Sequence, residues 1–171
     1  MTSDDLFFEA VNDYKKMRAR FDQRQELRGE YELLINFDQH TYHIFGLYQQ
    51  ATVGDINVPK LDYTDPVEIS YMWAWIKGNR KWHAWNKCKG ISKEEAKQLY
   101  ISEVKKLQNE LPDLIENWRD EQDPRIPDQK AWVPEEEKEE RQIITEKAKA
   151  ARRERDAIKR KEEEEAGMWD E

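Results

Sequence analysis

The sequence predicts an all-α protein, and three observations carry this prediction. Apolar residues recur at helical spacing, no segment alternates like a half-buried strand, and start and stop signals bracket the periodic segments. Charged residues make up 39% of the 171 residues and hydrophobic residues 37%. The seven Trp, seven Tyr and five Phe are too many for a chain that is disordered throughout, so we expect a folded part joined to a solvated part.

The N-terminal third predicts two helices. Ser3 is expected to cap the first helix, and its apolar stripe consists of Phe7, Ala10, Val11, Tyr14 and Met17. Residues 18–36 remain compatible with a helix. Residues 38–53 predict the second helix, which carries Tyr42, Phe45 and Leu47 and ends at Gly54.

The middle of the chain predicts three further helices after a loop over residues 56–64. Asp65-Pro66-Val67-Glu68 has the composition of a helix start, and Gly78 is expected to end that helix. Residues 79–89 predict another helix, stopped by Gly90. Ser92 and Glu95 form a capping box for the next one, which Pro112 is expected to end. The apolar stripe of this last helix consists of Ala96, Tyr100, Ile101, Val104 and Leu107.

The C-terminal part has a different composition. Residues 112–134 contain four prolines and predict a linker that packs only in places, through Trp118 and Trp132. In residues 135–165, 22 of 31 side chains are charged, which predicts a solvated helix over 135–166. Its apolar residues form too thin a stripe for a sustained coiled coil.

Charge and composition exclude several classes of protein. Residues 1–110 hold 17 acids and 16 bases, whereas residues 111–171 hold 20 acids and 13 bases, so the acidity lies in the tail. Because an acidic tail repels phosphate backbones, we expect no nucleic-acid partner. No run of residues has the length and apolarity of a membrane span. The single cysteine and the acidic N-terminus, which resembles neither a signal nor a transit peptide, favour a cytoplasmic protein.

No catalytic constellation is found, and we expect no enzyme and no cofactor. The phosphate-binding glycine loops and the hydrolase motifs are absent from the sequence. Cys88 lies between two lysines, a setting that lowers a thiol pKa, but we expect a helix-face thiol with no role. His40 and His43 with Asp38 have metal-ligand spacing, but surface histidines are expected instead of a metal site. His83, between Trp82 and Trp85, is expected to pack or to form a hydrogen bond.

Three blocks resemble the acyl-CoA-binding protein family. Residues 45–57 read FGLYQQATVGDIN, close to the family's Y-G-x-Y-K-Q-A-T-x-G-D signature. Residues 81–96 read KWHAWNKCKGISKEEA, close to its K-W-x-A-W-x-x-x-K-G-x-S-x-E-x-A block, and Tyr100, Ile101, Val104 and Leu107 match its last helix. The resemblance covers residues 3–111, with insertions at about 18–36 and 58–79.

The resemblance implies a four-helix up-down-down-up bundle that binds long-chain fatty acyl-CoA without chemistry, as a carrier. Tyr48, Lys81 and Tyr100 match family positions that contact the ligand, and Lys15 is expected to reach the phosphate end. Two positions depart from the signature. Phe45 replaces a tyrosine and loses a hydroxyl, and Gln49 replaces a lysine and loses a charge.

A second hypothesis explains these departures differently. The acyl-CoA-binding fold is then reused as an accessory structural subunit of a larger assembly, with a mitochondrial location. The weakened phosphate site, the aromatic insert Tyr71–Ile76 and the long tail favour it. Under this hypothesis the C-terminal tail and the insert bind a protein partner.

Overall fold

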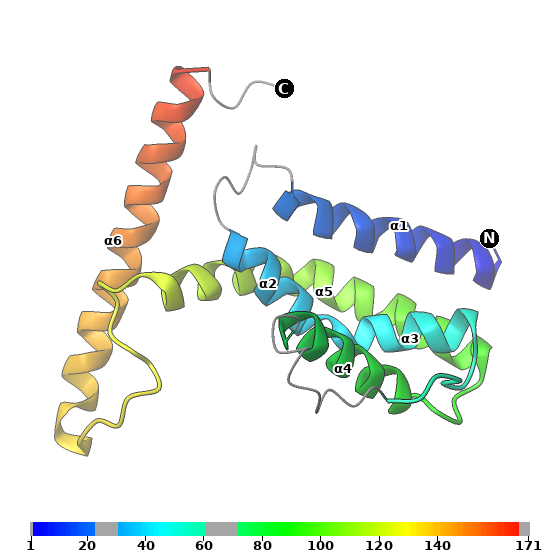
Figure 1. The fold of residues 1–171 in the computed structure, drawn as a ribbon. Coiled ribbons are helices and arrows are strands. Elements are labelled where there is room, and N and C mark those ends of the chain that lie inside the picture. The colour runs from blue at the N-terminus through cyan, green and yellow to red at the C-terminus, as the bar shows by residue number, and fades with distance from the viewer. Residues whose placement is uncertain (1, 23–30, 61–71, 168–171) are drawn as a thin grey trace. The chain divides into compact units, whose positions relative to one another are not determined.

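The computed structural model describes residues 2–22, 31–60 and 72–167 (Figure 1). Every regular element in these ranges is a helix, which confirms the predicted all-α class for the described chain. The elements are α1 (Ser3–Asp22), α2 (Tyr31–His40), α3 (Tyr42–Thr52), α4 (Met72–Asn86), α5 (Lys93–Gln122), the short 3₁₀ helix η2 (Glu135–Glu137) and α6 (Lys138–Glu165).

The contacts divide the chain into two compact units. The first consists of Met1–Ala19 and Leu34–Asn109, and the second of Arg20–Leu33 and Glu110–Glu171. The core of the first unit is built by the predicted stripes: Phe7, Ala10 and Met17 of α1 and Ala96, Tyr100, Ile101, Val104 and Leu107 of α5 are all buried. Both stripes are therefore confirmed.

The residue that caps the first helix differs from the predicted one. Thr2, not Ser3, caps α1: its hydroxyl accepts a hydrogen bond from Asp5 N at 3.1 Å, and the Asp5 carboxylate accepts one from Thr2 N at 3.2 Å. The prediction of Ser3 as the cap is wrong because this reciprocal pair needs an acidic side chain three residues after the cap. Asp5 stands three residues after Thr2.

The predicted helix over residues 38–53 is two helices. A turn at Thr41 separates α2 from α3. The buried Thr41 hydroxyl donates to Phe37 O at 2.9 Å and lies 3.2 Å from the Tyr14 hydroxyl of α1. Bonding of a threonine side chain to the preceding turn competes with the regular ladder, which accounts for the break. In the same region Arg18 of α1 pairs with Asp38 through two hydrogen bonds of 2.9 and 3.0 Å.

Two residues that were predicted to end helices lie inside helices. The α4 helix runs through Gly78, and α5 runs through Pro112 to Gln122. Gly78 does not take the left-handed conformation of a helix stop. Pro112 is exposed, so the carbonyl that its missing N–H leaves free can bind water. Consequently residues 112–122 are helical and the irregular segment spans only 123–134.

The α4 helix ends at Asn86, earlier than the predicted Lys89. Asp65 and Tyr71 lie outside the described residues, as do the side chains of the rest of the aromatic insert.

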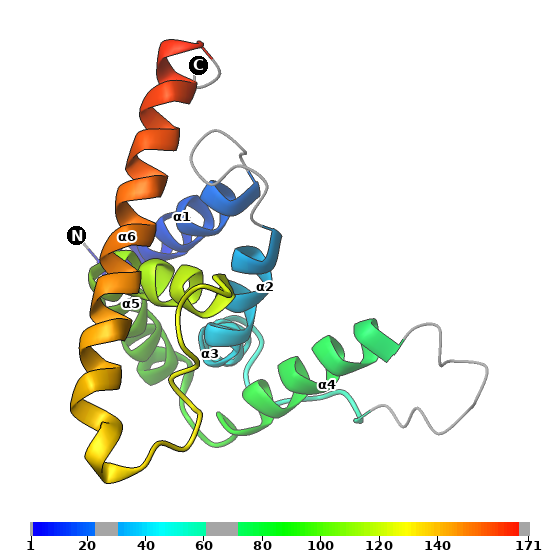
Figure 2. The ribbon, with the colours of Figure 1, turned by 90° about the vertical axis from the view of Figure 1, so that its left-hand side faces the viewer.

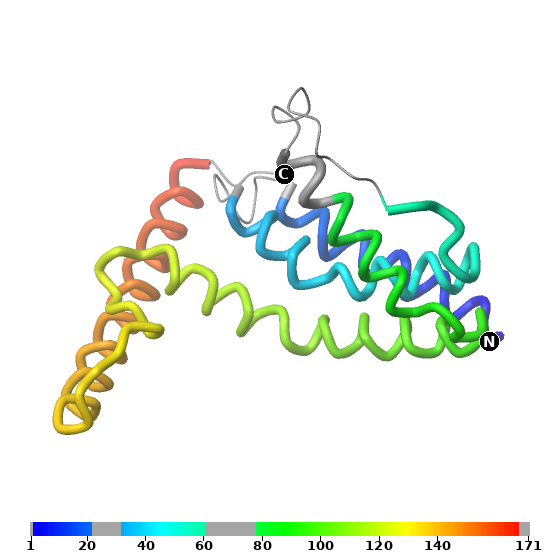
Figure 3. The backbone as a smooth tube through the Cα atoms, turned by 60° about the horizontal axis from the view of Figure 1, so that its bottom comes forward, coloured from blue at the N-terminus to red at the C-terminus, as the bar shows by residue number. Residues whose placement is uncertain are grey.

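The second unit joins the end of α5 to α6. Figures 1 and 2 show the last turns of α5 against the middle of α6, and Figure 3 shows residues 123–134 returning beside the first half of α6. The Gln129 side chain lies 3.3 Å from Thr145, and Arg141 donates to Asp128 O at 2.8 Å. Trp132 is 86% exposed, so it does not anchor this segment as predicted.

Three arginines of α6 pair with acids of the α5 end. Arg152, only 5% exposed, donates to Asp120 at 2.7 Å and to Glu116 at 2.5 Å, both of α5, and also to Asp156 of α6 itself at 2.6 Å. Arg153 reaches the same two α5 carboxylates, and Arg155 pairs with Asp123 at 2.9 Å. The predicted helix over residues 135–166 is therefore present as α6. It is not solvated on every side, because one of its faces packs against the end of α5.

Candidate functional site

An apolar cavity of about 590 Å³ lies between α3, the segment that follows α3, and α4. Three large aromatic side chains supply much of its wall, and among the lining residues that the structure describes two are lysines and none is acidic. The lining consists of Phe45 and Gln49 of α3, of Val58, Pro59 and Lys60, and of Gly78, Asn79, Lys81, Trp82 and Trp85 of α4. The wall thus combines an apolar surface with positive charge.

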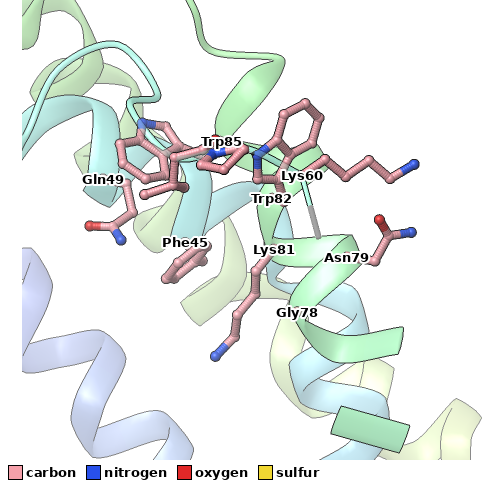
Figure 4. A pocket seen from close by; sticks show the side chains of 10 residues that line it. Phe45, Gln49, Lys60, Gly78, Asn79, Lys81, Trp82 and Trp85 are labelled. Atoms are coloured by element: carbon pink, nitrogen blue, oxygen red, sulfur yellow. Dashed lines mark hydrogen bonds between the residues drawn. The ribbon is translucent and has the colours of Figure 1, made fainter. Parts of the chain in front are cut away.

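Lys81 extends over the ring of Phe45. Its Nζ lies 5.2 Å from the ring centroid, and Figure 4 shows the two side chains facing each other beneath the tryptophans. Gln49 stands one helical turn after Phe45, so both project from the same face of α3. Phe45, Gln49 and Lys81, three of the predicted site residues, are therefore brought together.

The close approach of α3 and α4 sets the width of this site. A Cβ atom on Gly46 would lie 2.3 Å from the backbone oxygen of Ala84 and 2.6 Å from its carbonyl carbon. Only glycine fits against the facing backbone at that distance. The glycine of the first sequence block thus has a packing role.

The buried Gln50 side chain joins the first and second sequence blocks. Its amide donates to Asp55 Oδ1 and to Ile91 O, both at 2.8 Å, and Asp55 Oδ1 also accepts from Gly90 N at 2.9 Å. The Gly90 N–H and the Gln50 amide lower the pKa of Asp55 below its ordinary value, because both hydrogen bonds favour the carboxylate. These contacts fix the turn after α3 to the turn before α5.

Two indole groups hold the segment after α3 against α4. Trp85 Nε1 donates to Gly54 O and Trp82 Nε1 donates to Val58 O, each at 2.8 Å. Each tryptophan therefore lines the cavity with its ring while its N–H positions the chain that covers it. The Asn79 side-chain oxygen is buried and has no hydrogen-bond partner within the described ranges.

A second aromatic group contains the two predicted tyrosines. Phe7 of α1 lies between Tyr48 and Tyr100, with ring centroids 6.2 and 5.1 Å away. Tyr48 is 38% exposed, whereas Tyr100 is buried, and desolvation by burial raises the pKa of the Tyr100 hydroxyl. Tyr48 therefore offers a ring at the surface, and Tyr100 supports it from the core.

Comparison with known proteins identifies the family. Residues 4–104 match the family model described as acyl CoA binding protein. The chain belongs to the acyl-CoA-binding protein family. A protein from a Hypsibius species, named "Putative acyl-CoA-binding protein", is 40% identical to it over 70 residues, which is 41% of this chain and 67% of that protein. Membership confirms the predicted resemblance and supports acyl-CoA binding, since this is a family of binding and carrier proteins.

The structure places the remaining candidates from the sequence in packing and hydrogen-bonding contacts. No three His, Cys, Asp or Glu side chains of the described chain are grouped as metal ligands. His43 instead lies 3.2 Å from Glu103. Burial raises the pKa of the Cys88 thiol, which favours a neutral packed thiol over a thiolate. Among the described helices, none combines the length and apolarity needed to cross a membrane.

Of the family's expected contacts, Lys15 is exposed on α1 and is not among the residues that line the cavity. Sequence reasoning missed Val58, Pro59, Lys60 and Asn79. No motif marks these residues. Val58 O accepts a hydrogen bond from Trp82 Nε1, a contact between distant parts of the chain. Trp82 belongs to the second sequence block, but the block alone does not indicate that its ring lines the cavity.

Proposed function

We propose that the chain binds long-chain fatty acyl-CoA esters reversibly and acts as a carrier, with the family's four-helix up-down-down-up bundle formed by α1, α2–α3, α4 and α5. The observation that carries the proposal is the cavity in which Phe45, Trp82 and Trp85 stand beside Lys81 and Lys60. A long acyl chain gains by leaving water for such a wall, and CoA phosphates need cations.

Calorimetry on the full chain tests this proposal. Palmitoyl-CoA is expected to bind more tightly than octanoyl-CoA, and free CoA is expected to bind least, because each buried methylene adds about 0.8 kcal/mol. Equal affinities for the two esters would remove the long-chain preference. Absence of binding by palmitoyl-CoA would refute the function itself.

Replacement of Lys81 by alanine is expected to weaken palmitoyl-CoA binding about ten- to hundredfold. This loss corresponds to about 1.5–3 kcal/mol for a charge-assisted hydrogen bond to phosphate. Calorimetry at one fixed salt concentration measures it. Lys106→Ala is the matched control, since Lys106 is exposed on α5 and does not line the cavity. If the two variants bind equally well, Lys81 is not the phosphate anchor.

Restoring the family's residues is expected to tighten binding. Gln49→Lys adds a cation one turn from Phe45, and the gain is expected to be largest at low salt, where screening is weakest. Phe45→Tyr adds a neutral hydrogen bond of about 1 kcal/mol. A salt titration of palmitoyl-CoA affinity separates the two, because only the Gln49→Lys gain should shrink as salt rises. A Gln49→Lys gain that is independent of salt would contradict the charge mechanism.

A second candidate function is that of an accessory structural subunit of a larger assembly. The observation that favours it is the docked α6 helix, whose outer face exposes Ile143, Ile144 and Ile158. Cell fractionation followed by a density gradient distinguishes the candidates. A carrier is expected in small cytoplasmic fractions. A subunit is expected in large particles, with mitochondria as the expected location.

A further inference from the structure

The α6 helix has two opposite faces. Thr145 and Arg152 are buried on the face toward the end of α5. At 100° per residue, the opposite face carries three apolar pairs: Ile143 and Ile144, Ala150 and Ala151, and Ala157 and Ile158. All six are exposed, and each isoleucine retains about half of its surface, at 51%, 50% and 53% respectively.

These pairs repeat every seven residues, the spacing by which one helix meets another along a seam. The apolar residues of this segment form too thin a stripe for a sustained coiled coil. The structure shows that those left exposed lie on one stripe over residues 143–158, a little more than two heptads. This length suits a short contact between two helices.

Four charged residues lie along the middle of the same stripe and also repeat every seven residues. They are Glu140, Lys147, Glu154 and Lys161, all exposed, and their signs alternate. Within the described part of the chain, none of the four has an ion-pair partner. A protein surface that binds this face must therefore place opposite charges at the same seven-residue interval.

We propose that a second copy of this chain covers the face, with its α6 antiparallel to the first. A two-fold axis between Ala150 and Ala151 sets Lys147 opposite Glu154 of the second copy and Glu140 opposite its Lys161. The same axis sets Ile143 opposite Ile158 of the second copy and Ile144 opposite its Ala157, and the alanines at the centre permit close approach.

The charge order selects this arrangement over its alternative. A parallel pair in register places each of the four charges against its own copy, and like charges facing each other are destabilising. Polar residues on a helix seam fix register and orientation at a cost in affinity, so the dimer is weak. Beyond Glu140 and Lys161 the register opposes Glu139 to Glu162, which limits the contact to residues 140–161.

Sedimentation equilibrium of the full chain over a concentration series tests the proposal. The average mass is expected to rise from one chain toward two. Lys147→Glu places two glutamates together twice per dimer and is expected to raise the dissociation constant by at least about tenfold, and Glu154→Lys should act likewise. The double variant Lys147→Glu/Glu154→Lys restores both pairs and is expected to return to within about threefold of the parent.

Lys159→Glu is the control for net charge, because it makes the same charge change on α6 outside the stripe. It is expected to leave the dissociation constant within about twofold of the parent. Circular dichroism checks that each variant keeps its helix content. A single-chain mass at every concentration overturns the proposal, as does a double variant that stays as weak as either single one. Equal weakening by Lys159→Glu overturns it too.

Discussion

Replacement of Gly46 by alanine is expected to destabilise the protein by about 2–3 kcal/mol. The new methyl group would lie 2.3 Å from Ala84 O, and that oxygen belongs to the backbone of α4. A backbone cannot rotate away as a side chain can, so α3 and α4 must separate. Chemical denaturation measures the change, and the melting temperature should fall by roughly 10 °C.

Gly78→Ala is the matched control for Gly46→Ala. Gly78 also lies inside a helix that lines the cavity, but no described heavy atom is within 4 Å of its missing Cβ. Alanine there is expected to stabilise by about 0.5–1 kcal/mol, since it removes the entropic cost of a helical glycine. The two substitutions are chemically identical and opposite in expected sign. A Gly46→Ala variant as stable as the parent would show that the helices can move apart at little cost.

Residues 45–57 and 81–96 could be aligned with the family because the motif letters are contiguous. Their physical meaning could not be read in the same way. Gly46 meets Ala84, and Gln50 reaches Ile91, across long stretches of chain that one sequence does not pair. Phe45, Gln49 and Lys81 were placed at the site by the motifs, whereas Val58 and Lys60 reach the cavity through a loop conformation that carries no signature.

The wrong helix boundaries share a cause. Gly78 and Pro112 carry strong local signals, yet each costs only a few kcal/mol in a helix whose other residues favour it. The packing of α5 through Leu111 and Ile115, both buried on either side of Pro112, outweighs that cost. At Thr41 the reverse holds, because a weak local signal becomes a break once its hydroxyl is buried against Phe37 O.

The burial of Arg152 could not be predicted from the sequence, for a different reason. It stands in a run where most residues are charged, and such a run is typically a solvated face. Only the position of α6 beside α5 shows that one arginine of the run is buried while its neighbours Arg153 and Lys159 are exposed.

Arg152→Met is expected to loosen α6 from the end of α5 by about 3 kcal/mol, the low end of the range for a broken buried ion pair. Asp120, 5% exposed, would keep only Arg153 as a partner. Hydrogen exchange of the α6 amides measures the change, and their protection is expected to fall about a hundredfold. Lys159→Met removes an exposed charge from the same helix and should leave this protection unchanged.

A double variant separates a lost ion pair from lost packing. Arg152→Met/Asp120→Leu replaces both buried charges by apolar groups, which is often neutral or stabilising. Its α6 protection is therefore expected to recover most of the loss. If the double variant is as loose as Arg152→Met, the effect comes from the shape of the arginine and not from the Asp120 carboxylate that loses one of its two arginines.

The same cluster gives α6 docking a pH dependence of known sign. Desolvation raises the pKa of Glu116, but the hydrogen bonds from Arg152 and Arg153 outweigh it, and the net pKa lies below the ordinary value of 4.5. A carboxylate with a lowered folded-state pKa stabilises docking above about pH 4.5 and loses this contribution as the pH falls. Protection of α6 in the parent should therefore decrease with acid below that pH. In Arg152→Met the decrease should be smaller, because Glu116 keeps only one of its two arginine hydrogen bonds; an identical acid response in both proteins would contradict the assignment of the shift to Arg152.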